Sequence, residues 1–391
     1  MKKNKISILI YNGNEPLPKQ GGMERVTDSL ARGLKDKGFN VILLCKNKNR
    51  LGEIYTPPVP LYFIPENNPQ EYIKQIILNN NITHIIDQGE GEIIGRFGFL
   101  KKRDIFFKDI VMIAVQHSSA MSIINNYRII MKKSYNNKCF NYIYNNIILL
   151  FRKIHSTNII KSRYKELNSN YDKIVTLSPS FIDDFIKFNP NVNKDKLIAI
   201  PNMNSYETIN NIDKENRVLF VGRLNSEVKG CDKLLRIWKE TTKDIKDWHL
   251  DIVGDGPDKQ DLIELAKDLN IENCTFHGFS NPQPFYEKAQ IFCMTSIYEG
   301  FGMVLTEAMQ HGVVPMAFNS YSSVYDIITD NKDGYIIPAF DEKEYAKKLL
   351  ELIKNKEIII KYAQDAKISS ERFSKENVLN QWTNLIINTY K

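Results

Sequence analysis

The chain has 391 residues, a length that suits two domains of ordinary size. Hydrophobic residues make up 42% of it and charged residues 25%, proportions that are normal for a soluble globular protein and exclude a disordered chain. The net charge of +7 fits anionic ligands or an anionic membrane surface, and does not by itself imply nucleic acid.

The five cysteines are odd in number and lack Cys-x-x-Cys spacing, which argues against a disulfide framework or a zinc site. They are Cys45, Cys139, Cys231, Cys274 and Cys293. No run approaches the roughly twenty apolar residues that a membrane span needs. The apolar run at the start is too short for a signal peptide. We therefore expect a cytoplasmic protein.

The first elements form a β-α-β unit. Residues 6–11 are an apolar run of strand length, and after Gly21-Gly22 a helix carries Val26, Leu30 and Leu34 on one face. Residues 40–45 are the next strand, so the unit predicts a parallel sheet with right-handed crossovers. Further strands are predicted at residues 83–86, 109–115 and 173–177.

The segment from about residue 123 to 167 differs from its surroundings. It carries nine basic side chains against the single acid Glu166, with aromatic and aliphatic residues between them. This mixture suits an amphipathic surface on anionic lipid. An ordinary helical insertion with a solvated basic face explains it equally well, so both interpretations stay open.

The second half repeats the alternation of strands and helices after a polar stretch at residues 201–216 that resembles a linker. We predict strands at residues 217–221, 248–253, 274–277, 291–294, 313–318 and 334–337, and a terminal helix from residue 375. This pattern indicates a second doubly wound domain.

The most informative motif is a pair of glutamates, Glu299 and Glu307, that frame a Gly-Phe-Gly turn opening an apolar helix. Backbone N–H groups at such a turn, aided by the helix dipole, form a site for a phosphate. A carboxylate before the turn can hold sugar hydroxyls, and one within the helix can hold a ribose. The motif therefore predicts a pocket for a nucleotide-sugar at the carboxyl edge of the sheet.

Arg223 and Lys229 follow the first strand of the second half. Gly222 ends that strand, and the two cations are expected to project over the sheet edge and share a diphosphate. Phe279 follows a later strand after His277-Gly278, where the backbone can reach a nucleobase edge, while His277 itself is expected to be packed. Neither these glycines nor the Val-Gly-Asp-Gly-Pro motif ending at Pro257 form a dinucleotide fingerprint.

These motifs, in this order, resemble the family-four glycosyltransferases of the GT-B fold, especially bacterial enzymes that build surface polysaccharides. The likeness is strong from Arg217 to about Trp382, and weak in the first half, where Gly21-Gly22, His117 and an Ile-Pro-Asn sequence at residues 200–202 carry it. It implies two doubly wound, Rossmann-like α/β domains facing each other across a cleft, with a C-terminal helix crossing back to the first domain.

The resemblance also implies domain boundaries and residue roles. Residues 1–200 would form the acceptor-side domain, 201–216 the linker, 217–374 the nucleotide-sugar donor domain and 375–391 the returning helix. The implied catalytic residues are His117, beside the reacting sugar, and Glu299, on donor-sugar hydroxyls. The implied donor-binding residues are Gly21, Gly22, Arg223, Lys229, Phe279, Gly302, Met303, Val304 and Glu307.

The resemblance implies a retaining transfer of a hexose or N-acetylhexosamine from a nucleoside-diphosphate sugar, with UDP-sugars favoured, to a glycan or lipid-linked glycan. No Asp-x-Asp motif is found, so we expect neither a metal nor a cofactor, and no nucleic-acid partner. Contact with the inner face of the plasma membrane is expected if residues 123–167 bind lipid. Two alternatives stay open: a non-hydrolysing UDP-sugar 2-epimerase of the same fold, and a non-catalytic nucleotide-sugar-binding subunit.

Overall fold

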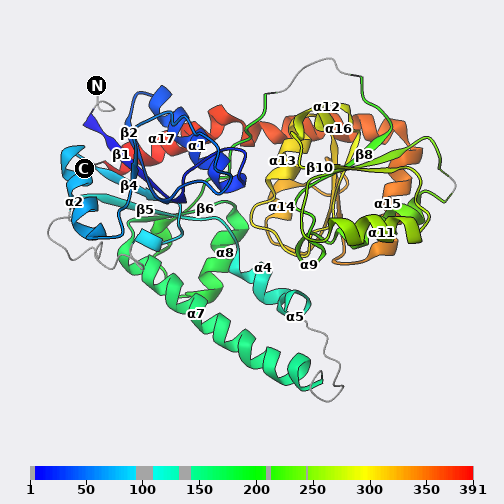
Figure 1. Ribbon diagram of the computed structural model, residues 1–391, viewed down its shortest axis with the longest axis horizontal. Coiled ribbons are helices and arrows are strands. Elements are labelled where there is room, and N and C mark those ends of the chain that lie inside the picture. The colour runs from blue at the N-terminus through cyan, green and yellow to red at the C-terminus, as the bar shows by residue number, and fades with distance from the viewer. Residues whose placement is uncertain (1–4, 94–108, 132–141, 208–212, 244, 391) are drawn as a thin grey trace. The chain divides into compact units, whose positions relative to one another are not determined.

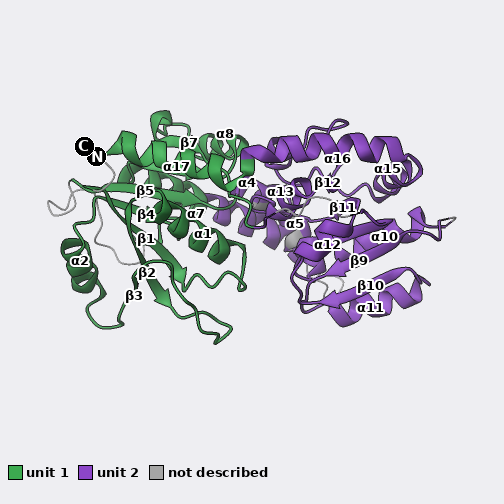
Figure 2. Cartoon of the chain, turned by 90° about the horizontal axis from the view of Figure 1, so that it is seen from above, with its two compact units in different colours: residues 1–118, 159–205, 373–391 green, residues 119–158, 206–372 purple. Residues whose placement is uncertain are grey.

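A computed structural model describes residues 5–93, 109–131, 142–207, 213–243 and 245–390 of the protein (Figure 1). The chain forms two compact units, which Figure 2 shows in separate colours. Unit 1 comprises residues 1–118, 159–205 and 373–391, and unit 2 comprises residues 119–158 and 206–372. Residues 119–158, which the sequence analysis assigned to the first domain, thus cluster with unit 2.

Unit 1 is built on a seven-stranded sheet in which all neighbouring strands are parallel, in the order β3-β2-β1-β4-β5-β6-β7. The strands are β1 (Ser7–Asn14), β2 (Asn40–Asn47), β3 (Leu61–Phe63), β4 (His84–Asp87), β5 (Val111–Gln116), β6 (Lys173–Thr176) and β7 (Leu197–Ala199). The five strands predicted for this half are confirmed. β3 and β7 lie at the two sheet edges and have three residues each, too few to show an alternating pattern.

The helices of unit 1 show the apolar spacing expected of elements that cover a sheet. They are α1 (Gly22–Asp36), α2 (Pro69–Asn79), α8 (Pro179–Phe188) and α17 (Lys375–Thr389), with the second half of α7 (Leu149–Asn170). The C-terminal helix α17 packs on α1: a β-carbon on Gly33 would lie 2.4 Å from a methyl carbon of Leu379, and Lys37 Nζ donates to Asn380 Oδ1 at 2.9 Å. The last helix of the chain therefore belongs to the first unit.

Unit 2 is built on a six-stranded parallel sheet with the order β10-β9-β8-β11-β12-β13. All six strands predicted for this half are confirmed. They are β8 (Arg217–Val221), β9 (His249–Val253), β10 (Cys274–Gly278), β11 (Ile291–Met294), β12 (Val314–Phe318) and β13 (Tyr335–Ile337). Their buried apolar side chains pack with those of the flanking helices, including Leu234, Leu235 and Trp238.

The helices of unit 2 follow the strands in alternation. They are α9 (Ser226–Lys229), α10 (Cys231–Thr241), α11 (Lys259–Asp268), α12 (Gln283–Lys288), α13 (Met303–Gln310), α14 (Val324–Ile327), α15 (Glu342–Lys354) and α16 (Lys356–Ser370). The segment at residues 119–158 adds α4 (Ala120–Asn125), α5 (Tyr127–Ile130), the π-helical turn Tyr144–Ile148 and the start of α7. Part of the predicted basic segment, together with Cys139, lies outside the described residues.

Each sheet has one point where the strand order reverses. In unit 2 the chain builds β8, β9 and β10 outward in one direction, then returns to place β11 on the other side of β8. In unit 1 the same reversal falls between β1 and β4. Open α/β sheets bind ligands outside the carboxyl ends of the strands at such a switch point. The loops that follow β8 and β11, and those that follow β1 and β4, are therefore the places to look for chemistry.

Candidate functional site

Three contacts lock together the loops that follow β8 and β11. Ile297 N donates to Val228 O at 2.8 Å, and Thr295 Oγ1 donates to Lys229 O at 3.1 Å. Gly230 has a φ of 60°, and a β-carbon there would lie 2.2 Å from the carbonyl oxygen of Thr295. Only glycine fits such a close backbone approach. The two loops at the switch point of unit 2 are therefore held in a fixed position relative to each other.

Lys229 and Glu299 meet at this point. The Lys229 ammonium forms an ion pair with Glu299 Oε1, and Ser296 Oγ donates to the same oxygen at 2.7 Å. Both side chains are mostly shielded, with 23% of Lys229 and 11% of Glu299 exposed. Burial, with a smaller contribution from the Glu299 charge, holds the pKa of Tyr321 well above its usual range. The sequence motifs are therefore brought together as one cation, one carboxylate and their hydroxyl neighbours.

The turn after Glu299 presents backbone donors. Gly302, the N-cap of α13, has a φ of 95°, and Ser323 Oγ holds the turn by donating to Phe301 O at 3.0 Å. Within the described part of the chain, the amide groups of Gly302, Met303 and Val304 have no hydrogen-bond acceptor. Unpaired N–H groups at a helix start carry a partial positive charge that attracts anions. The turn therefore offers three donors to a phosphate close in sequence to Glu299.

Glycines also stack the ends of β8, β9 and β10. Gly222 N donates to Val253 O at 3.0 Å, and Gly254 N donates to Gly278 O at 2.8 Å. Gly254 has a φ of 142°, and a β-carbon there would lie 1.9 Å from the carbonyl oxygen of Gly222. The Val-Gly-Asp-Gly-Pro motif thus brings the backbone after β9 against the backbone after β8. The motif therefore supports the loop ends beside the predicted pocket through its backbone.

Arg223 and Phe279 stand at this glycine layer with exposed side chains. The Arg223 guanidinium has no hydrogen-bond partner among the described residues, and Phe279 is 73% exposed directly after β10. His277 Nε2 donates to Asp251 Oδ1 at 2.8 Å, and the imidazole packs against the Phe285 ring. His277 is therefore packed, as expected, whereas the guanidinium and the phenyl ring are available to a ligand.

Glu307 lies deeper than the predicted ribose contact suggests. Glu307 lies on α13 and is only 1% exposed, and Tyr286 OH donates to its Oε2 at 3.1 Å. The Tyr286 ring stacks on His311, whose Nδ1 pairs with Glu307 O at 2.7 Å. Because the carboxylate is covered, a ribose can reach it only if the side chains over it move.

The predicted residues of unit 1 follow β1 and β5. Gly21 is extended before α1, and a β-carbon there would lie 2.7 Å from Glu24 Oε2, while Gly22 begins the helix. His117 directly follows β5, and its backbone N–H donates to Glu90 Oε1 at 3.0 Å. His117 Nε2 is buried, with no hydrogen-bond partner among the residues that the structure describes. Burial lowers the pKa of His117, so the ring is neutral near pH 7.

Sequence reasoning missed Asn126, which ties the segment at residues 119–158 to the site of unit 2. Its amide nitrogen donates to Ile297 O and Ser320 O, both at 2.8 Å, and it is buried. These carbonyls belong to the loops after β11 and β12. The segment contains many asparagines, so nothing in the sequence singles out the one that makes this contact.

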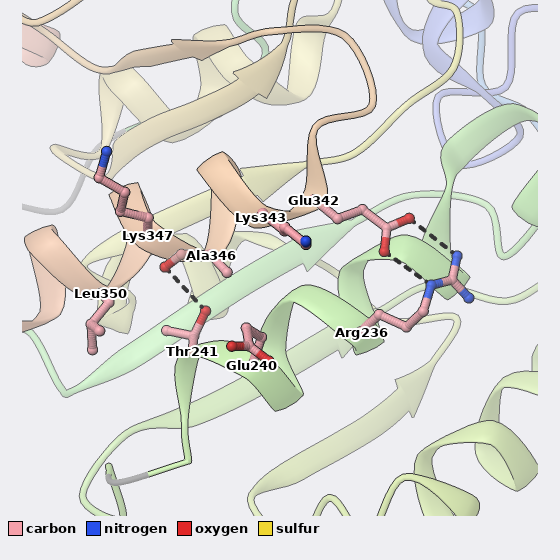
Figure 3. Close-up of a pocket in the computed structure, with 8 residues that line it drawn as sticks. All are labelled: Arg236, Glu240, Thr241, Glu342, Lys343, Ala346, Lys347 and Leu350. Atoms are coloured by element: carbon pink, nitrogen blue, oxygen red, sulfur yellow. Dashed lines mark hydrogen bonds and ion pairs between the residues drawn. The ribbon is translucent and has the colours of Figure 1, made fainter.

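A pocket of about 520 Å³ lies elsewhere on unit 2, between α10 and α15 (Figure 3). Its charged lining is largely self-paired: Arg236 Nε donates to Glu342 Oε2 at 3.0 Å, and Glu240 pairs with Lys243. It contains none of the predicted site residues. We therefore place the candidate site at the β8–β11 switch point and not in this pocket.

The described residues contain no group of three or more His, Cys, Asp or Glu that could hold a metal ion. No described helix is long and apolar enough to cross a membrane.

The part of the chain that holds this site matches a known protein family. Residues 203–369 match the family model described as glycosyl transferases group 1. A glycosyltransferase of Haemophilus influenzae with no characterised activity is 26% identical over 98% of this chain and 99% of its own length. The amylovoran biosynthesis glycosyltransferase AmsD of Erwinia amylovora is 33% identical over 44% of this chain. The chain spans about half the length of AmsD.

Solved structures match the whole chain. HepE of Anabaena in complex with UDP has a TM-score of 0.74 at 15% identity, covering 98% of this chain and all of that one. The lipopolysaccharide outer core galactosyltransferase WaaB in its apo form has a TM-score of 0.69 at 17% identity, with 98% and 99% covered. The predicted fold is confirmed: the chain has the GT-B fold. It is a glycosyltransferase, and its residues 203–369 match the group 1 family model.

Proposed function

We propose that the chain transfers a hexose or N-acetylhexosamine from a UDP-sugar to a glycan or lipid-linked glycan during the synthesis of a bacterial surface polysaccharide, retaining the anomeric configuration and needing no metal. The observation that carries the donor assignment is the Lys229–Glu299 pair next to the unpaired amides of Gly302, Met303 and Val304. These groups offer a diphosphate one cation and three N–H donors, and they offer a sugar one carboxylate.

The printed descriptions of similar proteins support the donor and acceptor classes. HepE was solved in complex with UDP and with UDP-glucose. A relative in Campylobacter jejuni, 33% identical over 44% of this chain and 48% of its own length, is an N-acetylgalactosaminyltransferase acting on a glycan linked to undecaprenyl diphosphate. AmsD acts in amylovoran biosynthesis. We extend these classes to this chain because residues 203–369 hold the site motifs.

The chemistry follows from where charge develops. As the anomeric C–O bond breaks, negative charge grows on the departing diphosphate, and pre-oriented donors stabilise it as an oxyanion hole does. In this proposal Arg223, Lys229 and the start of α13 bind that diphosphate. Removing one such donor typically lowers the rate by about 10²–10³-fold. Phe279 would contact the base, and Glu307 the ribose once uncovered.

The remaining roles place the sugar. Glu299 binds donor-sugar hydroxyls. The acceptor hydroxyl attacks the anomeric carbon on the face from which the phosphate departs, with assistance from that phosphate, and the configuration is therefore retained. The loop at Gly21 and Gly22 contacts the phosphates, and His117 contacts the sugar near the reacting carbon. The neutral ring of His117 and its unpaired Nε2 suit a hydrogen bond with a sugar hydroxyl.

The experiment that tests the donor is calorimetry without metal, using UDP-glucose, UDP-galactose, their N-acetyl forms and GDP-mannose. Selective micromolar binding of a UDP-sugar supports the proposal and identifies the donor. Silence across the panel with folded protein contradicts it and favours a subunit that does not use such donors. Incubation with UDP-N-acetylglucosamine alone distinguishes the epimerase, because only that enzyme changes carbon 2 without an acceptor.

We further propose that residues 142–158 lie on the anionic inner face of the plasma membrane, where a lipid-linked acceptor is found. Ile143, Ile147, Leu150, Phe151 and Ile154 follow one another at intervals of four, three, one and three residues, and each is between 37% and 67% exposed. That spacing puts them on one face of the helical segment that runs into α7. Within residues 142–158 the chain also carries Arg152 and Lys153 and no Asp or Glu, a charge that favours anionic lipid.

Co-sedimentation with vesicles tests this surface. We expect binding to phosphatidylglycerol vesicles at low salt and weaker binding to phosphatidylcholine vesicles. The triple change Ile147→Ser, Leu150→Ser and Phe151→Ser should abolish binding. A matched control changes two exposed isoleucines of α16, Ile360→Ser and Ile368→Ser, and should bind normally. No binding of the unaltered protein to anionic vesicles would remove the membrane from the proposal.

A further inference from the structure

Glu90 stands in an unusual backbone conformation at the switch point of unit 1. It follows β4, has a φ of 54° and precedes Gly91, whose φ is 98°. Residues other than glycine, asparagine and aspartate seldom adopt such a left-handed conformation. A glutamate held there indicates that its surroundings fix it, and such positions gather at functional sites.

The base of the Glu90 loop is held by Asp87. Asp87 Oδ1 accepts from Gly89 N at 2.8 Å, and Oδ2 accepts from Ile93 N at 3.2 Å and from Tyr171 OH at 2.5 Å. Three donors from both sides of the turn therefore converge on one buried carboxylate. The turn at residues 87–93 is closed on itself, so Glu90 at its tip has little freedom to move.

The carboxylate of Glu90 joins two other elements. Its Oε1 accepts from His117 N at 3.0 Å, and its Oε2 accepts from Arg163 Nη2 at 3.1 Å. Arg163 also holds the Glu90 carbonyl oxygen, with Nε at 3.2 Å and Nη2 at 2.7 Å. With 17% of its side chain exposed, Glu90 is largely shielded from water, so these charge-assisted bonds are strong.

The loop that carries His117 is fixed on both sides. Glu90 holds the His117 amide, and Gln116 Nε2 donates to Ser118 O at 3.1 Å. The imidazole Nε2 has no partner in the described part of the chain. The backbone of His117 is thus held in place while one ring nitrogen stays available.

We propose that Glu90 is a positioning residue for His117, and that Arg163 on α7 holds Glu90 in place. This inference rests on the proposed contact of His117 with the donor sugar, and it adds two residues that the sequence motifs did not indicate. Glu90 itself touches no substrate in this proposal. It orients the loop of His117 through the backbone and places a negative charge beside the ring.

The charge beside the ring has a measurable consequence. Burial lowers the pKa of His117, and Glu90, the Gln88 backbone and Glu24 act in the opposite direction, with Glu90 first among them. Arg163 faces the same site through its bonds to Glu90. Glu90→Gln keeps the shape and an acceptor oxygen but removes the charge, so the pKa of His117 should fall further. If the neutral ring is the active form, the acid side of the pH–rate profile should move to lower pH.

The experiment combines kinetics with a titration that needs no turnover. UDP release from UDP-glucose gives kcat and KM, calorimetry gives UDP affinity, and NMR follows the imidazole signals of the full-length protein with pH. His117→Gln assigns its signal among the six histidines. We expect Glu90→Gln to lower kcat by about 10-fold to 10²-fold, the range for a small displacement of a catalytic group, with UDP affinity unchanged.

Two further variants keep the test decisive. Glu166→Gln removes an exposed acid from the same helix as Arg163 and should change neither kcat nor the pKa of His117. Arg163→Met leaves the Glu90 charge in place, so kcat should fall without a fall in the pKa. It also serves if Glu90→Gln fails to fold. Unchanged kcat and unchanged His117 pKa in Glu90→Gln would overturn the inference.

The inference and the proposed function fail in different ways. If His117→Ala releases UDP at the normal rate, the proposed role of His117 is wrong, and the positioning role falls with it. If His117→Ala is inactive but Glu90→Gln and Arg163→Met are both normal, the role of His117 stands and only the positioning inference is wrong.

Discussion

The Lys229 ammonium and the Glu299 carboxylate form an ion pair across the switch point of unit 2, with Ser296 as a third partner. Their residues lie in the loops after β8 and β11, which are neighbouring strands. Because both side chains are mostly shielded, each one satisfies the other when no ligand is bound. A diphosphate and a sugar would have to replace this ion pair with contacts of their own. Substitution of either side chain should therefore change ligand affinity in a way that depends on which part of the ligand it contacts.

Glu299→Gln should affect the affinity for UDP-sugar and the affinity for UDP differently. The change removes the charge that we assign to the donor-sugar hydroxyls, and it releases Lys229 from its ion pair. We expect affinity for the UDP-sugar to fall by about 10-fold or more, the effect of losing a charged hydrogen bond. Affinity for UDP alone should stay the same or rise, and turnover should be abolished with the fold intact. Calorimetry with both ligands measures the difference. Equal losses for UDP and UDP-sugar would contradict a sugar contact.

Arg223→Ala and Lys229→Met should both weaken UDP binding, because both cations are assigned to the diphosphate. A charged hydrogen bond contributes about 1.5–3 kcal/mol, so each Kd should rise by about 10-fold to 150-fold. Added salt should weaken UDP binding more in the unaltered protein than in either variant, because salt screens the attraction of the cation that each variant lacks. Arg236→Ala, in the pocket between α10 and α15, is the matched control and should bind UDP normally. Normal UDP affinity in Arg223→Ala would remove that residue from the site.

Much of the fold could be predicted from the sequence because both halves carry strong periodic signals. Every predicted strand of unit 2 is present, and the glycine motifs mark the loop ends where backbones touch. β3 and β7 were missed because three residues cannot show a period. The residues of 119–158 were assigned to the first half because sequence order suggests it, whereas Asn126 binds carbonyls of the loops after β11 and β12.

The site was less predictable than the fold. Motifs located Lys229, Glu299 and the start of α13, but they could not show that Glu307 is covered or that Tyr286 bonds it. Glu90 was missed as well, because its importance lies in a left-handed conformation and in contacts with residues 27 and 73 positions away. Such contacts depend on tertiary packing and leave no local pattern in the sequence.

Gly254→Ala should destabilise unit 2 strongly. Its new β-carbon would lie 1.9 Å from the carbonyl oxygen of Gly222, and its φ of 142° also strains an L-residue. Overpacking and backbone strain together should cost at least about 3 kcal/mol. The matched control is Gly38→Ala, where φ is 87° but no atom lies within 4 Å. That change should cost only about 1–2 kcal/mol. Thermal unfolding of both variants makes the comparison, and equal losses would show that the close approach is unimportant.

Tyr171→Phe should destabilise the protein more at pH 7.5 than at pH 4.5. Burial raises the pKa of Asp87 to about 6, and the Tyr171 hydroxyl is the first of the groups that lower it. An acid with a raised pKa in the folded state binds more protons there than in the unfolded chain. The stability that protonated Asp87 contributes is therefore lost as pH rises through 6. The Tyr171 bond limits that loss because it stabilises the ionised form.

Removing this hydroxyl therefore matters most when Asp87 is charged. A hydrogen bond to a charged group contributes about 1.5–3 kcal/mol and one to a neutral group about 0.5–1.5 kcal/mol, so the destabilisation should grow by about 1 kcal/mol between the two pH values. Urea unfolding of the variant and the unaltered protein at each pH measures it. Taking the difference cancels His84, whose pKa burial lowers to about 4 and whose contribution to stability therefore rises with pH over the same range. Tyr362→Phe removes a bond to the neutral carbonyl of Asn331 and should cost the same at both pH values. A pH-independent cost for Tyr171→Phe would mean that Asp87 is already ionised at pH 4.5.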